Sequence, residues 1–281
     1  MAISGTNSST LDDLFVNIVA QARFTAEEQS LMLGLVSQYN IAGQAGKTVQ
    51  IPKYPAITAA ALDEGTAPSD TDVSTTSVTV DVAEVGNTVL LTDLAAMGAG
   101  NPADELGTVL GNAIATKIDS DLIALFSDFT TEIGAGAGQE ITVANLFKAA
   151  ATLRNNKAQG QLAAVVNPFQ AYQLKAGLTN SFVGANLSEV GNAAMQSGFV
   201  GTVAGINVFE SANVAIDSNG DSVAAVFAPE ALAIALKSEF NLETQRNATR
   251  RGTEMVATAI YGVDTLDNTY GVKLTTDATV A

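Results

Sequence analysis

The 281-residue sequence predicts a mixed α+β fold, in which a long helix separates an extended β-hairpin from a later α/β region. Three observations predict this class: alternating Val residues before position 83, apolar residues at spacings of three and four over residues 102–129, and helix caps that alternate with apolar runs after residue 140. The chain is long enough for one large domain or two ordinary ones, and its 47% apolar content can form a core.

The first forty residues predict two short helices. Thr10 caps the first, and Thr25 with Glu28 forms a capping box for the second. The apolar face of this second helix is made by Leu31, Leu35 and Val36. Such segments have too little apolar surface to form a domain, so we expect them to dock on another surface.

Residues 40–92 predict an extended hairpin. Residues 47–54 form a strand that ends at prolines, and residues 78–82 alternate Val with polar side chains. The tip between them is polar and acidic, and no basic residue occurs between Lys53 and Lys117. Because a hairpin with so few large apolar residues is marginal by itself, we expect it to rest on another surface.

Residues 102–129 predict the clearest helix of the chain. Asn101 is a good N-cap, Pro102 suits the first helical position and Asp104 favours the first turn. At about 1.5 Å per residue this helix would reach roughly 40 Å, well beyond the usual length. We expect it to be the spine of the fold.

Helices and strands alternate over the remaining residues. The first helix is capped by Thr142 and its apolar face is made by Leu146, Phe147, Ala150 and Leu153. The elements predicted after it are a buried strand at 162–166, a short helix from Pro168 to Gly177, a loop at 178–200, strands at 206–209 and 223–227, a short helix from Pro229, and three strands between 239 and 275.

The composition and motifs argue against an enzyme. Without His or Cys the chain has no disulfide, no imidazole or thiolate metal site and no catalysis by these groups. Residues 98–103 fit a loose dinucleotide-binding pattern, but the helix that follows is too long for a Rossmann unit. Residues 217–221 resemble a calcium loop but favour an Asn-Gly turn. Asp63 and Glu64 are adjacent on a strand-like segment, so they face opposite sides and make a poor catalytic pair. We expect no cofactor.

Charge restricts the partners. A formal net charge of −16 disfavours wrapping nucleic acid or binding an anionic membrane, because both depend on Lys and Arg. We find no signal peptide and no apolar run of about 20 residues that could span a membrane. One basic cluster, Arg246, Arg250 and Arg251, lies in a strand-like segment. It could protect an edge strand, meet the acidic hairpin of its own chain, or receive the hairpin of a neighbouring molecule.

Several short motifs follow one another along nearly the whole chain. They are Lys47-Thr-Val-Gln-Ile-Pro-Lys-Tyr54, Leu62-Asp-Glu-Gly65, residues 78–93 ending in Leu-Leu-Thr-Asp, Asn167-Pro168 with Tyr172-Gln-Leu174, Gly205-Ile-Asn-Val-Phe-Glu-Ser211, Phe227-Ala-Pro-Glu-Ala-Leu232 and Tyr261-Gly262. Each is weak alone. In this order and spacing they resemble the major capsid proteins of tailed bacteriophages, which have the Hong Kong 97-type capsid fold.

The resemblance implies a division of the chain. Residues 1–40 would be an N-terminal arm, 41–92 an extended loop, 93–133 a peripheral domain with the spine helix, 134–240 an axial α/β domain, and 241–281 C-terminal strands that return partly to the peripheral domain. The subunit-interface residues that we expect are Lys47, Lys53, Tyr54, Asp63, Glu64, Asp70, Asp72, Arg246, Arg250 and Arg251. Some family members crosslink a loop Lys to a neighbour; the loop tip of this chain has no Lys, so we expect no crosslink.

The resemblance also implies a function. The protein would self-assemble into the pentamers and hexamers of an icosahedral shell enclosing double-stranded DNA, in the host bacterial cytoplasm, and would reside in the virion. The chain starts with an arm-like helix, so we expect a separate scaffolding protein; a portal protein, a decoration protein and DNA bound without sequence specificity are further expected partners. An acidic subunit fits this role, because a basic lining would hold the DNA tightly.

Three alternatives remain. An encapsulin-like compartment shell shares the fold and would need a cargo-binding groove near the arm. A secreted acidic surface or binding protein would need an export signal. A carboxylate-dependent hydrolase would need a deep pocket with perturbed carboxylates.

Overall fold

The computed structural model describes residues 30–55, 57–59, 61, 65, 67, 70, 72–98, 103–134, 138–181 and 199–279. Within these ranges the helices are α2 (Asp93–Gly98), α3 (Ala103–Ala124), α4 (Val143–Asn155) and α5 (Pro168–Ser181). Short 3-10 turns are η1 (Met32–Gly34), η2 (Leu125–Asp128), η3 (Pro229–Ala231) and η4 (Asn268–Tyr270).

The described strands form three sheets. The long sheet has the order β1 (Ser37–Asn40), β10 (Leu232–Asn247), β11 (Gly252–Thr265) and β4 (Ala83–Thr92). The second sheet has the order β5 (Thr131–Glu132), β12 (Gly271–Asp277), β9 (Asp221–Phe227), β6 (Leu162–Val166), β8 (Ile206–Glu210) and β7 (Phe199–Val203). The third sheet is the hairpin β2 (Thr48–Lys53) and β3 (Thr76–Asp81).

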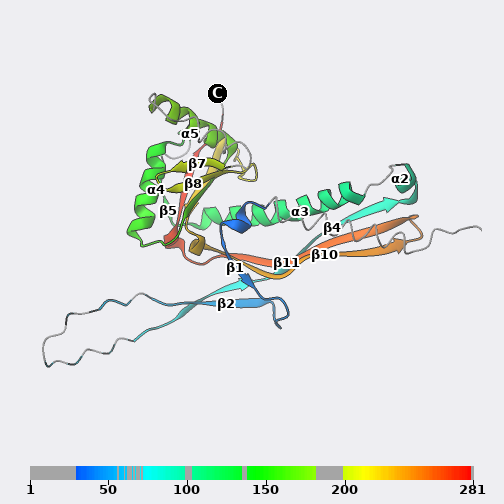
Figure 1. Cartoon of the computed structure of the whole chain (residues 1–281), viewed down its shortest axis with the longest axis horizontal. Helices are drawn as coiled ribbons and strands as arrows, with labels where there is room; N and C mark the ends of the chain where they lie inside the picture. Colours follow the sequence, from blue (N-terminus) through cyan, green and yellow to red (C-terminus); the bar gives the residue numbers. More distant parts are fainter. Residues whose placement is uncertain are drawn as a thin grey trace, which may run out of the picture.

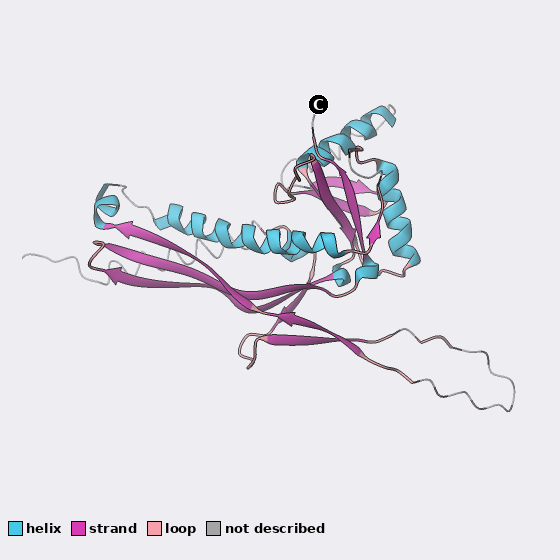
Figure 2. Ribbon diagram, turned by 180° about the vertical axis from the view of Figure 1, so that it is seen from behind, coloured by secondary structure: helices cyan, strands magenta, loops and turns pink. Residues whose placement is uncertain are grey.

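These elements give the subunit an elongated body from which a lobe and a hairpin project. Figure 1 shows α3 lying along the long sheet, the second sheet with α4 and α5 forming a separate lobe at one end, and the β2–β3 hairpin extending away from the body. The view from behind shows the same three parts (Figure 2). The predicted extended hairpin and spine helix are therefore both present. The helix is shorter than predicted, because α3 ends at Ala124 and residues 125–128 form η2, and its predicted start, Asn101 and Pro102, lies outside the described residues.

The main core lies where α3 meets both large sheets. Ile118 and Leu122 on α3 pack with Phe227 of the lobe and Ile234 of the long sheet. A second core fills the lobe, where Leu146, Leu153 and Leu174 of its helices cover the second sheet. The spine helix thus belongs to both parts of the subunit, because one buried surface joins them.

The predicted strands of the hairpin and the Thr142-capped helix are confirmed. The β2–β3 pair is antiparallel and in register from Thr48 opposite Asp81 to Lys53 opposite Thr76. The Thr142 hydroxyl accepts a hydrogen bond from the Asn145 amide at the start of α4, as expected of an N-cap. On this helix, however, Phe147 is exposed and does not belong to the buried face.

The second predicted N-terminal helix is wrong over its described residues. Residues 32–34 form only the η1 turn, and residues 37–40 form β1, parallel to β10. The turn is held from outside: Asp119 on α3 accepts hydrogen bonds from the Ser30 hydroxyl and from two backbone amides. The rest of the two predicted helices, residues 1–29, lies outside the described residues.

Several later boundaries also differ from the prediction. Helix α5 continues past Gly177 to Ser181, because one glycine costs a helix only about 1 kcal/mol relative to alanine and need not end it. Part of the predicted loop 178–200 is β7, which returns to β8 through Ala204 and Gly205, both at positive φ. The predicted helix at Pro229 is only the η3 turn, and β10 begins at Leu232 rather than near residue 239.

Candidate subunit interface

The extended hairpin is anchored at its base and exposed beyond it. Val49 and Ile51 of β2 pack with Val80 and with Ala235 of the long sheet. Farther out, Tyr54 is 69% exposed, Ile57 59% and Val73 45%. Water-exposed apolar side chains on a thin projection are costly unless a partner covers them.

The acidic residues of the hairpin face solvent where they are described. Asp70 and Asp72 are exposed, whereas Asp63 and Glu64 lie outside the described residues. Lys47 is exposed too, and its backbone carbonyl accepts a hydrogen bond from the Val82 amide at 2.8 Å. The hairpin therefore exposes carboxylates as well as the Tyr and Ile side chains.

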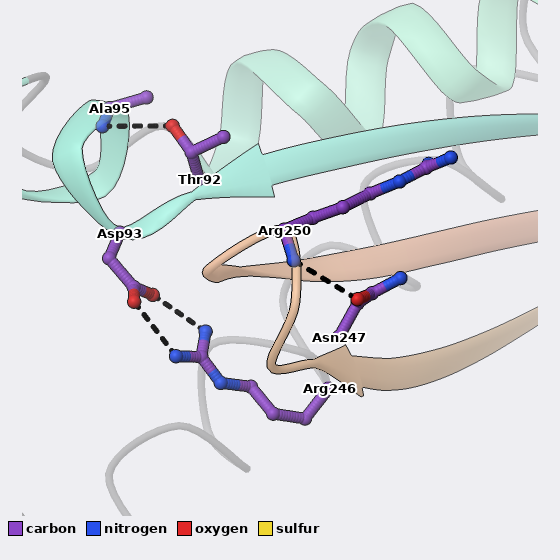
Figure 3. Close-up of polar contacts among 6 residues, drawn as sticks. All are labelled: Thr92, Asp93, Ala95, Arg246, Asn247 and Arg250. Atoms are coloured by element: carbon purple, nitrogen blue, oxygen red, sulfur yellow. Dashed lines mark hydrogen bonds and ion pairs between the residues drawn. The ribbon is translucent and has the colours of Figure 1, made fainter.

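The arginine cluster lies at the turn between β10 and β11. Arg246 forms two hydrogen bonds with Asp93 of α2, with Nη1 donating to Oδ1 at 2.6 Å and Nη2 to Oδ2 at 2.8 Å (Figure 3). Arg251 adopts a φ of 46°, and its carbonyl accepts a hydrogen bond from the Asp93 amide at 2.9 Å. Arg246 is thus engaged inside its own subunit.

The other two arginines remain available on the surface. The Arg250 guanidinium lies 3.6 Å from the carboxylate of Glu254, and both Arg250 and Arg251 are exposed. Figure 1 shows the β10–β11 turn and the β2–β3 hairpin at opposite ends of the subunit. The described hairpin residues therefore do not meet the arginine turn of the same chain, and a contact between the two surfaces requires two molecules.

The Arg246 pair makes a testable electrostatic prediction. The hydrogen bonds from Arg246, helped by the charge of Arg251, lower the pKa of Asp93. A lowered folded pKa favours the folded state above the ordinary pKa, and this contribution is lost as the pH falls through the folded value. We expect Arg246→Gln to raise the pKa of Asp93 toward its ordinary value, measured by carboxyl-carbon NMR titration. Arg250→Gln is the control, and an equal shift in both variants would contradict the assignment.

Partners of two sequence-predicted residues could not be foreseen. Lys53 forms an ion pair with Asp267, in the loop between β11 and β12, and Arg246 pairs with Asp93. Sequence reasoning also missed exposed aromatic residues on the lobe, Phe169 and Tyr172, which lie three positions apart on α5. The motif containing Tyr172 was the available signal.

The carboxylates of the described ranges do not gather into a metal site, since no group of three or more Asp or Glu side chains there could hold an ion. No described helix is both long and apolar enough to cross a membrane. The residues at 217–221 form a turn, in which backbone amides donate to Asp217 and lower its pKa. The predicted Asn-Gly turn is confirmed.

The subunit combines a spine helix, a separate lobe and an outstretched hairpin, an arrangement that suits a protein that builds shells from copies of itself. The phage capsid protein family matches residues 74–274, and the chain belongs to this family. It is a structural capsid protein, a major capsid protein of the Hong Kong 97-type fold, and its place is the capsid of a virion. Family membership sets aside the hydrolase and the secreted surface protein.

Solved structures share the fold at low sequence identity. The capsid of cyanophage P-SCSP1u is 17% identical, with a TM-score of 0.69 and 89% coverage of both chains. The Mycobacterium phage Che8 structure is 20% identical, with a TM-score of 0.61, covering 82% of this chain and 85% of that one. The holo-SrpI encapsulin complex of Synechococcus elongatus is 11% identical, with a TM-score of 0.65 and 89% coverage of both. No curated protein sequence matches the chain.

Proposed function

We propose that this capsid protein assembles into the pentamers and hexamers of an icosahedral shell that encloses the double-stranded DNA of a tailed phage. Assembly would take place in the host bacterial cytoplasm. One observation carries the proposal: the hairpin exposes Tyr54, Ile57 and Val73 on a projection that the other described residues leave uncovered, as suits a surface that meets another molecule. The net charge of −16 supports a container that does not retain its DNA by charge.

We propose a charge-complementary contact between neighbouring subunits. The donor surface is the hairpin, with Tyr54, Asp70 and Asp72; Lys47, Asp63 and Glu64 belong to the same loop in the sequence. The receiving surface is the β10–β11 turn of a neighbour, where Arg250 and Arg251 are exposed. Arg246 acts indirectly, because its pair with Asp93 links this turn to α2.

The proposed domain division follows the sequence boundaries. Residues 1–40 are the arm, 41–92 the extended loop, 93–133 the peripheral domain, 134–240 the axial domain and 241–281 the returning strands. Strand β4, at the end of the loop range, pairs along its length with β11 of the long sheet. The part of the loop that projects is therefore the β2–β3 hairpin.

The proposed partners follow from the same role. A shell of this kind would use a separate scaffolding protein during assembly, a portal protein at one vertex, and a decoration protein where one exists. Contact with packaged DNA would be independent of sequence, and no membrane is involved. The absence of Lys between Lys53 and Lys117 supports a shell without lysine crosslinks in the loop.

Encapsulation of a protein cargo is the second candidate function. The observation that favours it is the likeness to an encapsulin shell, which covers 89% of this chain. Nucleic-acid extraction together with protein mass spectrometry, applied to particles purified from the native source, separates the two. Packaged DNA supports the phage shell, and a stoichiometric enzyme in its place supports the compartment.

Charge reversal at the two surfaces tests assembly. We expect the wild-type chain, expressed with its scaffolding protein, to give closed polyhedral particles by negative-stain electron microscopy. Asp70→Lys with Asp72→Lys should reduce particle yield at least about tenfold, since like charges then face each other across the contact. Arg250→Glu with Arg251→Glu should do the same, and the fourfold combination should recover particles.

The matched control reverses a charge away from both surfaces. Asp128→Lys changes an exposed carboxylate in η2 and should leave the particle yield unchanged. Equal yields for the hairpin variants and this control would contradict the proposed contact. A wild-type chain that stays monomeric at high concentration with its scaffold would contradict the shell itself.

A further inference from the structure

The hairpin is held to the body at two separate places. The first is its base, where Val49 and Val80 pack on Ala235, and where β3 passes close to β11. At this crossing a Cβ atom on Gly262 would overlap the Asp81 carbonyl, so only glycine admits the passing backbone. The second place is Lys53, the last residue of β2, whose ammonium pairs with Oδ2 of Asp267.

Asp267 is built to receive this lysine. Its other oxygen, Oδ1, accepts hydrogen bonds from the Thr269 amide at 3.0 Å and the Thr269 hydroxyl at 2.7 Å. The backbone of the same loop is fixed to the core, because the Leu266 and Asp267 amides both donate to the buried Ala231 carbonyl. The carboxylate is therefore a rigid anchor with one oxygen left for Lys53.

The pair is more sheltered on one side than on the other. The Asp267 side chain is 12% exposed and the Lys53 side chain 47%. Burial alone would raise the pKa of Asp267, but the hydrogen bonds from Lys53 and Thr269 outweigh it, and the pKa lies below its ordinary value. The anchor is thus ionised at neutral pH.

The position of the pair gives it leverage. Lys53 lies two residues beyond Ile51, the outermost residue of β2 that packs at the base, which corresponds to about 7 Å along an extended strand. The hairpin has its own two-stranded sheet and shares no strand with the long sheet, so it can pivot at its base. A link far from a pivot restrains rotation more strongly than one at the pivot.

We propose that Lys53 is a positioning residue for assembly: its ion pair with Asp267 braces the hairpin and fixes the direction in which it reaches the neighbouring subunit. This inference rests on the proposed function of the hairpin as a limb between subunits. If the hairpin already points in one direction in the free subunit, it loses less conformational entropy when it binds the neighbouring subunit. It also narrows the range of hairpin directions among the free subunits.

The first experiment measures the hairpin direction in the unassembled subunit. Because the chain has no Cys, spin labels at Val73→Cys and Lys148→Cys report one distance between the hairpin and α4. A partly exposed ion pair shifts a two-state population by up to about fivefold, so Lys53→Met should populate displaced hairpins about fivefold more than wild type. Asp267→Asn should do the same while keeping its bonds from Thr269, and Lys53→Arg should restore the wild-type distribution.

The control and the second readout separate this inference from the proposed function. Lys47→Met removes the same charge just before β2 and should leave the distance distribution unchanged. In particles, Lys53→Met should broaden the diameter distribution seen by electron microscopy, and Lys157→Met, which removes an exposed lysine charge from the lobe, should not. An unchanged distance distribution in both Lys53→Met and Asp267→Asn would overturn the brace even if shells form normally. If the spin-label distance distribution broadens in Lys53→Met but the wild-type chain never assembles, the brace is supported and the shell function is overturned.

Discussion

Replacing Gly271 by alanine is expected to lower the free energy of unfolding by about 3 kcal/mol, because the added methyl group would overlap a buried aromatic ring. Gly271 opens β12 and is buried. A Cβ atom there would fall on the ring of Phe129, which is 1% exposed. That ring cannot easily move, because it stacks on the ring of Phe126 with 6.3 Å between the ring centroids. The Phe126 ring in turn packs on that of Phe227, with 5.6 Å between centroids.

Urea denaturation of the unassembled subunit measures this effect. The matched control is Gly177→Ala in α5, where a Cβ atom would meet nothing within 4 Å. Alanine is favoured over glycine in a helix by up to about 1 kcal/mol, so this variant should be as stable as wild type or more so. If Gly271→Ala unfolds at the same urea concentration as Gly177→Ala, the described packing of Phe129 is wrong.

Replacing Asp119 by alanine should lower the free energy of unfolding by about 3 kcal/mol, because buried donors lose their acceptor. Asp119 lies on the spine helix and is buried. Its Oδ1 accepts from the Ser30 hydroxyl at 2.7 Å and the Met32 amide at 3.1 Å, and its Oδ2 accepts from the Leu31 amide at 3.1 Å. One carboxylate therefore holds the whole turn before β1.

The same carboxylate predicts a pH dependence with a definite sign. Burial raises the pKa of Asp119 above its ordinary value of 3.8, although the three hydrogen bonds oppose the shift. The folded state then binds the proton more tightly than the unfolded state, so this contribution is largest at low pH and decreases as the pH rises through the folded pKa. The stability of wild type relative to Asp119→Asn should therefore decrease with rising pH across this interval.

Urea denaturation at a series of pH values from about 4 to 7 tests this sign for the shifted carboxyl. Asp128→Asn changes an exposed carboxylate just beyond α3 and serves as the control. A wild-type advantage over Asp119→Asn that grows with pH would show that the hydrogen bonds outweigh burial. That result would contradict a raised pKa for Asp119.

Local signals predicted the elements that local interactions stabilise. The hairpin strands follow from alternation, the spine helix from its apolar spacing, and α4 from its Thr142 cap. The turn at 32–34 and the strand at 37–40 depend instead on distant groups. Asp119 supplies the acceptor for the turn, and the edge of β10 supplies the hydrogen bonds for the strand. A helix pattern over Leu31 and Leu35 was overridden by these tertiary contacts.

The candidate interface residues show the same difference between what local sequence signals indicate and what only the folded chain brings together. Charge identified the arginine cluster as a candidate, because cations are scarce in this chain, and the motif from Lys47 to Tyr54 added Lys53 through the family resemblance. Their partners, Asp267 and Asp93, lie far away in sequence and become visible only when the sheets are assembled. The β7–β8 turn was missed for a different reason, since Ala204 at a φ of 57° occupies a position that sequence rules give to Gly or Asn.

Strands β3 and β4 run almost without interruption, with only Val82 between them. Strand β3 pairs with β2, and strand β4 pairs with β11. A shift of this continuous segment by one residue would therefore turn every side chain to the wrong face in both sheets. Insertions and deletions are consequently excluded from residues 76–92, the segment that forms β3, Val82 and β4. Changes in the length of the hairpin can accumulate only between Lys53 and Thr76, so they would alter the surface proposed to meet the neighbouring subunit while leaving both sheets in register.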